Sequence, residues 1–281
     1  MTAPALVLLG YGSADPGVAL VSEQIRTALA TQRPNLDIEV AFLDHCAPSA
    51  PQVVDRLVAQ GVTEVVLVPL LLSDAFHAQV EVPAVVAAIA ATHPRLRITA
   101  SRPIGPETSL LSVVDRRLRD ALRSRRVSEL DGLVFAAAGS TDVRSNAIVA
   151  RRARQWATHH RLPCVTAFAL ASGPTTAEAV RTLRGQGRRH IAVGSWFLAP
   201  GALFTRQADL AYEAGAIAVS DPMGAEPEIA EVALVRYVVA ALELVDLDTP
   251  AAGTDLDSPF EVDTTYELEP APPRHLTVVS A

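Results

Sequence analysis

The feature that most constrains this chain is an order of short apolar runs and longer amphipathic segments that occurs twice. In the first half, the runs expected to form strands are Ala5–Leu9, Ile38–Leu43, Val65–Leu72 and Leu96–Ala100. In the second half they are Leu133–Ala137, Cys164–Leu170, His190–Ser195 and Ile217–Ser220. Strands that alternate with helices predict βαβ units and parallel sheets covered by helices on both faces.

Helix patterns follow the strand runs throughout. They are expected at about Pro16–Thr31, from Ser49 onward, Val80–Thr92, Pro106–Arg123, Val143–His159, Thr175–Gly185, up to Ala214, and Glu226–Leu244. Two loops recur at nearly the same spacing: Gly12-Ser13 matches Gly139-Ser140, and Leu71–His77 matches Phe197–Leu203. This spacing indicates a tandem duplication.

The predicted fold class is therefore α/β, with two tandem flavodoxin-like, three-layer α/β/α lobes that contain parallel sheets. We expect an N-terminal domain over residues 1–125 that carries the site. A degenerate C-terminal repeat follows over 131–245, with the seam near Ser124–Leu130. Residues 246–281 are acidic and rich in Pro, Thr and Asp, which predicts a mostly disordered tail.

Composition excludes several classes of function. The net charge is −7, the pI is near 5.5, and all 24 basic residues are arginine. A chain without lysine cannot use a lysine Schiff base or a P-loop lysine, and the acidic balance argues against nucleic-acid partners. No apolar stretch reaches the roughly 20 residues of a membrane span. Two cysteines give no disulfide framework, and the N-terminus has the pattern of a first strand instead of a signal peptide, so we expect a cytoplasmic protein.

Three polar side chains follow the first three strands of the predicted sheet. Tyr11, Asp44 and His77 each come directly or a few residues after a strand. Because the carboxyl ends of parallel strands share one edge, these residues are expected to converge there. A phenol, a carboxylate and an imidazole suit a transition-metal ion with open positions, or the removal of protons from a substrate nitrogen. His45 and Cys46, beside Asp44, are possible further ligands.

Each of these residues also has a structural interpretation. The tyrosine can act as a lid on the sheet, the aspartate can cap a turn, and the histidine can be a cap or a satisfied core residue. Gly10-Tyr11-Gly12-Ser13 lacks the third glycine of the dinucleotide fingerprint and the lysine of the P-loop. An α/β enzyme that acts on a phosphorylated or acidic metabolite through Gly12-Ser13 is an alternative, and Asp15 is the nearby base that it would need.

The same residues resemble a known family. Gly10-Tyr11-Gly12-Ser13, Ala41-Phe42-Leu43-Asp44, and Val68–Leu72 leading to His77 and Glu81-Val82-Pro83 are similar to motifs of the sirohydrochlorin chelatase family, CbiX type. The resemblance covers residues 5 to about 240. It is strong in the first half and degenerate in the second, as in the long, duplicated members.

The resemblance implies roles for these positions. His77 stands at the family's second metal-site histidine, and Asp44 at its active-site glutamate. Tyr11 stands where the family has its first metal-site histidine, so an imidazole is replaced by a phenol that titrates near ~10. In the second half, Ala138 and Leu203 occupy the positions of Tyr11 and His77. That half therefore resembles a lobe that has lost its site and closes the cleft.

The implied reaction is the insertion of Fe2+, or Co2+ or Ni2+, into sirohydrochlorin for siroheme or cobalamin, a lyase-type activity without ATP or a redox cofactor. We expect His77 to bind the metal or accept protons, Asp44 to orient His77 or share the metal, and Tyr11 to be an oxygen ligand or a wall. Substrate carboxylates are expected at Gly12 and Ser13, and at Arg102, Arg144 and Arg206. The duplication suggests a monomer. A non-catalytic carrier of tetrapyrrole or metal stays an alternative.

Overall fold

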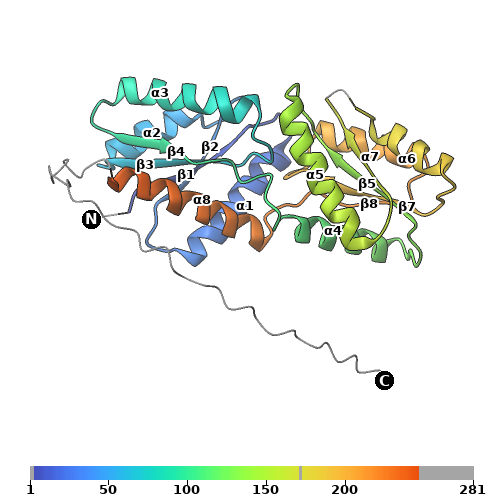
Figure 1. Ribbon diagram of the computed structural model, residues 1–281. Helices are drawn as coiled ribbons and strands as arrows, with labels where there is room; N and C mark the ends of the chain where they lie inside the picture. Colours follow the sequence, from blue (N-terminus) through green and yellow to red (C-terminus); the bar gives the residue numbers. More distant parts are fainter. Residues whose placement is uncertain (1–2, 171–172, 247–281) are drawn as a thin grey trace, which may run out of the picture. The chain divides into compact units, whose positions relative to one another are not determined.

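Two four-stranded sheets organise the computed structural model, which describes residues 3–170 and 173–246 (Figure 1). Every neighbouring pair of strands in both sheets is parallel, and the sheet orders are β2-β1-β3-β4 and β6-β5-β7-β8. The strands are β1 Ala5–Gly10, β2 Ile38–Phe42, β3 Glu64–Pro69, β4 Arg97–Ala100, β5 Gly132–Ala137, β6 Cys164–Phe168, β7 Ile191–Trp196 and β8 Ala218–Val219. The predicted fold class is confirmed, because each half forms a parallel α/β lobe.

The helices alternate with these strands. They are α1 Pro16–Gln32, α2 Ala50–Ala59, the π-helix η1 His77–Glu81, α3 Val82–Thr92, α4 Leu111–Ser124, α5 Val143–His160, α6 Thr176–Gly185, α7 Ala202–Glu213 and α8 Pro227–Asp246. Both lobes start their first helix in the same way. Asp15 accepts a hydrogen bond from the Gly17 amide of α1, and Asp142 accepts from the amides of Arg144 and Ser145 in α5.

Three element bounds differ from the sequence pattern for physical reasons. The apolar run expected as a strand to Leu72 leaves the sheet after Pro69, and residues 70–72 line a cavity instead. The helix expected from Val80 begins at His77, with one π turn before α3. The helix expected from Pro106 begins at Leu111, because residues 101–110 first carry the chain from the first sheet to the second.

The two halves exchange their last helices. Helix α4 belongs to the first half of the chain but packs on β7 and β8 of the second sheet. Helix α8 belongs to the second half but packs on β3, β4 and α1 of the first lobe (Figure 1). The predicted domain borders, 1–125 and 131–245, follow the repeat in the sequence, whereas the packing groups α8 with the first sheet and α4 with the second.

The apolar core follows this exchange. The largest cluster of buried side chains runs through both lobes, from Leu6 and Leu8 of β1 to Phe135 of β5 and Trp196 of β7, and includes α4 and α8. Two smaller clusters fill the other face of each sheet, under α2 and α3 in the first lobe and under α6 and α7 in the second. The shared cluster joins the two lobes, because separating them would disrupt its close packing at a cost in free energy.

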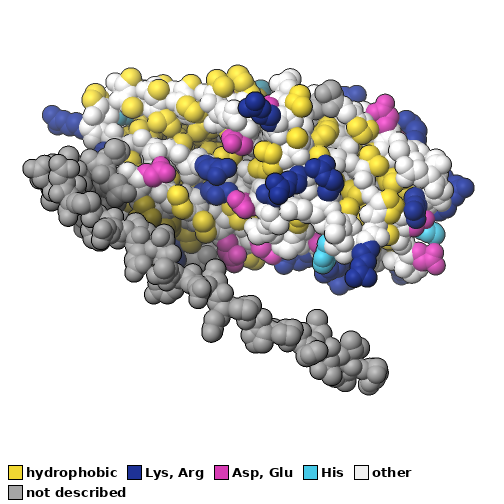
Figure 2. Space-filling view, in the orientation of Figure 1, with side chains coloured by type: hydrophobic (Ala, Val, Ile, Leu, Met, Phe, Trp, Pro, Cys, Tyr) yellow, Lys and Arg dark blue, Asp and Glu magenta, His cyan; other side chains and the backbone are white. Residues whose placement is uncertain are grey.

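The outer surface of α8 is unusually apolar. Hydrophobic side chains gather over α3 and α8 on the face that Figure 2 shows, and Val235, Val238, Val239 and Leu242 of α8 are exposed. Of the predicted acidic tail, 246–281, everything after its first residue lies outside the described residues. A search of the helices in the described part of the chain finds none with the length and apolar content of a membrane span.

Leu244 tests the helix exchange. Its side chain is 3% exposed in the shared cluster, and its carbonyl oxygen accepts a hydrogen bond from Arg97 of β4 at 3.0 Å. We expect Leu244→Ala to lower the free energy of unfolding by about 2–5 kcal/mol, measured by denaturant titration. Leu242 is the matched control, because it is 60% exposed on the same helix and Leu242→Ala should cost less than about 0.5 kcal/mol. Equal costs for the two leucines would contradict the packing described here.

Candidate functional site

A cavity of about 490 Å³ lies where the carboxyl ends of both sheets meet. Its walls come from the loops after β1, β3, β5, β6 and β7, the start of α7 and part of α5. Such loops are the usual place for ligands in parallel α/β folds. The Trp196 indole donates a hydrogen bond to the Leu72 carbonyl oxygen at 3.3 Å, which ties the wall from one lobe to the wall from the other.

The cavity lining is mainly apolar. It includes a leucine run at 70–72, Phe76 and Leu203, and Phe76, Leu170 and Leu203 are also exposed at its edge. Over the described residues that line it, Tyr11 and His77 are the titratable side chains, and no arginine takes part. A concave apolar site with few polar groups is suited to a ligand with apolar surface whose orientation those few groups fix.

His77 is positioned by the π turn that opens α3. Its Nδ1 atom lies 2.7 Å from Oε2 of Glu81, four residues later in η1. An ionised carboxylate accepts hydrogen bonds, so this contact places the proton on Nδ1 and leaves the lone pair on Nε2. Nε2 is then free to bind a metal ion or to accept a proton. π turns often occur at functional sites because they re-aim one side chain.

Tyr11 packs directly on His77. The two ring centroids are 4.3 Å apart, with the planes tilted by 49°. Burial, followed by the negative charges of Glu81 and Asp44, raises the pKa of the Tyr11 phenol above its ordinary value. The phenol therefore stays protonated at neutral pH, next to the imidazole.

Asp44 has a different neighbour from the one expected. Its Oδ1 accepts a hydrogen bond from the His45 amide at 2.7 Å, and its Oδ2 lies 3.6 Å from His45 Nε2. The carboxylate in contact with His77 is that of Glu81, which the sequence interpretation did not select as a site residue. The four-residue spacing of His77 and Glu81 indicates this contact, because residues four apart on a helix are neighbours on its surface.

The loop that carries Asp44 is held against Gly12. Gly12 has a φ of +97°, and a Cβ atom there would lie 1.8 Å from the Asp44 carbonyl oxygen. The Asp44 amide donates to the Tyr11 carbonyl at 2.9 Å. Gly12 thus allows the loops after β1 and β2 to touch. This close contact explains the glycine without a role in phosphate binding.

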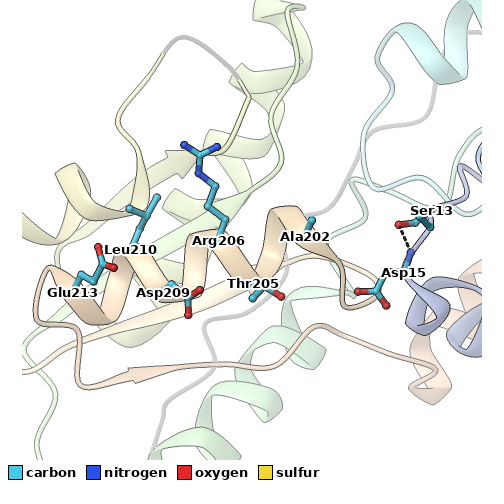
Figure 3. A pocket seen from close by; sticks show the side chains of 9 residues that line it. Ser13, Asp15, Ala202, Thr205, Arg206, Asp209, Leu210 and Glu213 are labelled. Atoms are coloured by element: carbon cyan, nitrogen blue, oxygen red, sulfur yellow. Dashed lines mark hydrogen bonds between the residues drawn. The ribbon is translucent and has the colours of Figure 1, made fainter.

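The residues expected to bind substrate carboxylates do not line this cavity: Gly12, Ser13, Arg102, Arg144 and Arg206 all lie outside its lining. Ser13 Oγ accepts from the Asp15 amide at 3.0 Å, and Asp15 caps α1, so the protein's own carboxylate occupies that helix N-terminus. Arg206 lines a second cavity of about 600 Å³ beside Ser13 and Asp15 (Figure 3). Arg102 and Arg144 are exposed and line neither cavity.

The second half contributes a wall without a histidine or tyrosine. Ala138 and Leu203, at the positions matched to Tyr11 and His77, both line the cavity. Asn146 bridges the Ser140 amide and carbonyl at 3.0 and 2.7 Å, which fixes the glycine turn of this half. Within residues 3–170 and 173–246, no three His, Cys, Asp or Glu side chains gather closely enough to hold a metal ion.

Comparison with known proteins gives one family. The CbiX family model matches the chain twice, over residues 5–121 and 132–240. A sirohydrochlorin cobaltochelatase of Priestia megaterium is 24% identical over 72% of this chain and 66% of its own length. A sirohydrochlorin ferrochelatase of Bacillus subtilis is 33% identical over 29% of this chain and 31% of its own length. The aligned part thus spans less than two thirds of either relative.

Solved structures share the fold. SirB from Bacillus subtilis with Fe3+ superposes with a TM-score of 0.72 at 21% identity, over 88% of this chain and 98% of that one. CbiX, described as the terminal enzyme of siroheme biosynthesis in denitrifying bacteria, gives 0.59 at 19% identity, over 85% and 99%. At these identities the likeness establishes the arrangement of both lobes and no more.

Gly12→Ala tests the close contact between Gly12 and the Asp44 carbonyl. We expect it to lower the free energy of unfolding by about 1–3 kcal/mol, measured by denaturant titration, because the methyl group displaces the Asp44 carbonyl. Gly61→Ala is the matched control, since Gly61 has a similar φ of +90° but open space around its Cβ position. The difference between the two variants measures the clash. If Gly12→Ala costs no more than Gly61→Ala, the contact does not shape the loop.

Proposed function

This chain belongs to the CbiX family of sirohydrochlorin chelatases, and we propose that it inserts a divalent metal ion, Fe2+ with Co2+ as the alternative, into sirohydrochlorin. The observation that carries the proposal is one histidine, with its Nδ1 atom bound by a carboxylate, at an apolar cleft between two lobes. Relatives named as ferrochelatases and as cobaltochelatases both match, so the choice of metal rests on experiment. We expect the reaction to take place in the cytoplasm.

His77 is the base in this mechanism. Metal insertion replaces two N–H protons of the macrocycle with one divalent cation, and both protons leave to water. Nε2 of His77 accepts a proton from the macrocycle or holds the incoming ion, and Glu81 stabilises the positive charge that forms on the ring. Tyr11 is the protonated wall against which the imidazole is held. ATP and redox cofactors have no step in this reaction.

The lining of the cleft is compatible with the apolar faces of a macrocycle. Leucine, phenylalanine and tryptophan side chains from both lobes offer apolar surface to the faces of a macrocycle. No arginine lines this cavity among the described residues, and we propose that carboxylate arms of sirohydrochlorin extend beyond it. Arg206 lines the second cavity together with Asp15, Asp209 and Glu213, and it is the cation we propose for one of these arms against the charge of those three carboxylates.

A tetrapyrrole carrier is the second candidate, and Tyr11 is the observation that favours it. A phenol with a raised pKa is a poorer metal ligand at neutral pH than the imidazole that the family resemblance implies for this position. A carrier would change the absorption spectrum of added sirohydrochlorin but leave insertion at the spontaneous rate. Under that outcome, a gain of activity in Tyr11→His would identify the lost group.

His77→Ala tests the proposed base. We expect the anaerobic rate of Fe2+ or Co2+ insertion, followed by absorption, to fall about 10²- to 10⁴-fold, the usual contribution of a positioned general base. The melting temperature should stay close to that of the wild type, since the side chain is partly exposed. Full activity in His77→Ala would rule out this role.

Glu81→Gln tests the orientation of His77. An amide has no charge to balance an imidazolium and can present either an oxygen or an NH2 group to Nδ1. We expect insertion to slow by about 10- to 100-fold, the usual effect of changing the partner of a metal-site histidine, while binding of sirohydrochlorin is retained. Glu81→Asp should recover part of the rate. Equal rates in the wild type and Glu81→Gln would show that the hydrogen bond is incidental.

A further inference from the structure

A second imidazole–carboxylate pair lies beside the first. Asp44 and His45 follow β2, and the side chain of His45 contacts Tyr11 with ring centroids 5.4 Å apart and planes at 73°. Tyr11 therefore touches both His45 and His77. The Asp44 and His45 side chains are 66% and 52% exposed, more than those of Glu81 and His77 at 35% and 42%.

The two pairs differ in their spacing. Glu81 Oε2 and His77 Nδ1 are 2.7 Å apart, a hydrogen bond that leaves no room for an ion between them. Asp44 Oδ2 and His45 Nε2 are 3.6 Å apart, beyond hydrogen-bond distance. Two ligands of one transition-metal ion, each bound at about 2.1 Å, stand roughly 3.0–3.5 Å from each other. At 3.6 Å the outer pair is slightly wider than this range, so the two side chains would have to approach each other to share an ion.

The backbone of His45 is held in an unusual conformation. Its φ is +63°, in the left-handed region that few residues other than glycine adopt. The Cys46 amide donates to the Asp44 carbonyl at 2.8 Å, and that carbonyl lies against Gly12. These contacts fix the turn that brings the imidazole of His45 to the carboxylate of Asp44.

We infer that Asp44 and His45 form an entry site for the divalent metal substrate, which passes along Tyr11 to His77. This inference rests on the proposed function. An imidazole nitrogen and a carboxylate oxygen suit Fe2+ or Co2+. Two protein ligands completed by water hold an ion weakly, which suits an ion that must move on. The exposure of the pair opens it to solvent, whereas Tyr11 and His77 line the cavity.

Two variants separate this role from a structural one. His45→Asn removes the imidazole but is compatible with the left-handed conformation, which asparagine adopts readily. His93→Ala is the matched control, because His93 also pairs with a carboxylate, Asp55, at 2.7 Å in the same half of the chain, and neither residue lines the cavity. Circular dichroism and the melting temperature of His45→Asn establish that it is folded.

Metal binding is measured first, by anaerobic titration of the tetrapyrrole-free protein with Co2+, followed by absorption. Insertion rates are then measured against Co2+ concentration at saturating sirohydrochlorin. We expect His45→Asn to weaken Co2+ binding and to raise the KM for Co2+ about tenfold or more, with a much smaller fall in kcat. His93→Ala should match the wild type in both measurements.

The outcomes are distinguishable. Unchanged Co2+ binding and an unchanged KM for Co2+ in folded His45→Asn would overturn the entry site and leave the chelatase proposal standing. A wild-type protein that binds Co2+ through His45 but does not accelerate insertion would overturn the chelatase proposal and support a metal site at Asp44 and His45. Equal losses in His45→Asn and His93→Ala would also contradict the inference, because they would indicate nonspecific binding to surface histidines.

Discussion

The shared apolar core under the two exchanged helices is the constraint on which the rest of the structure depends. Helix α4 packs on the second sheet and helix α8 on the first, so neither lobe can bury its own sheet without the other half of the chain. The carboxyl ends of both sheets are thereby brought to the walls of one cavity. Because the two halves share one core, both walls of the cleft belong to one folded unit.

The imidazole–carboxylate pairs lie in the first lobe, where Tyr11 and His77 line the cavity. His77 and Glu81 form one imidazole–carboxylate pair, Asp44 and His45 form another, and Tyr11 touches both imidazoles. The second lobe presents Ala138 and Leu203 at the matched positions. Under the proposed function, one wall would exchange protons and metal while the other would offer apolar surface to the macrocycle.

The sequence predicted what depends on local pattern. The alternation of strand and helix patterns predicted two parallel sheets. Because the ends of parallel strands share one edge, it also predicted that Tyr11 and His77 lie close together. The helix exchange could not be predicted from the sequence, because the apolar face of α8 would have the same pattern whichever sheet it covered. Asp44 was expected near His77, but its partner depends on the left-handed turn at His45, which no spacing rule specifies. Arg102 and Arg144 were chosen by residue type alone, and their helix and loop positions place them outside both cavities.

The most direct test of the account is the protonation of the His77 ring in the cleft. A sample labelled with 15N in its seven histidines, compared with His77→Ala for assignment, reports which ring nitrogen carries the proton. We expect a proton on Nδ1, and we expect the Nε2 resonance to shift when Zn2+ is added as a diamagnetic probe. A proton on Nε2, or a Zn2+ shift confined to other histidines, would contradict the claim that Glu81 presents His77 to the metal.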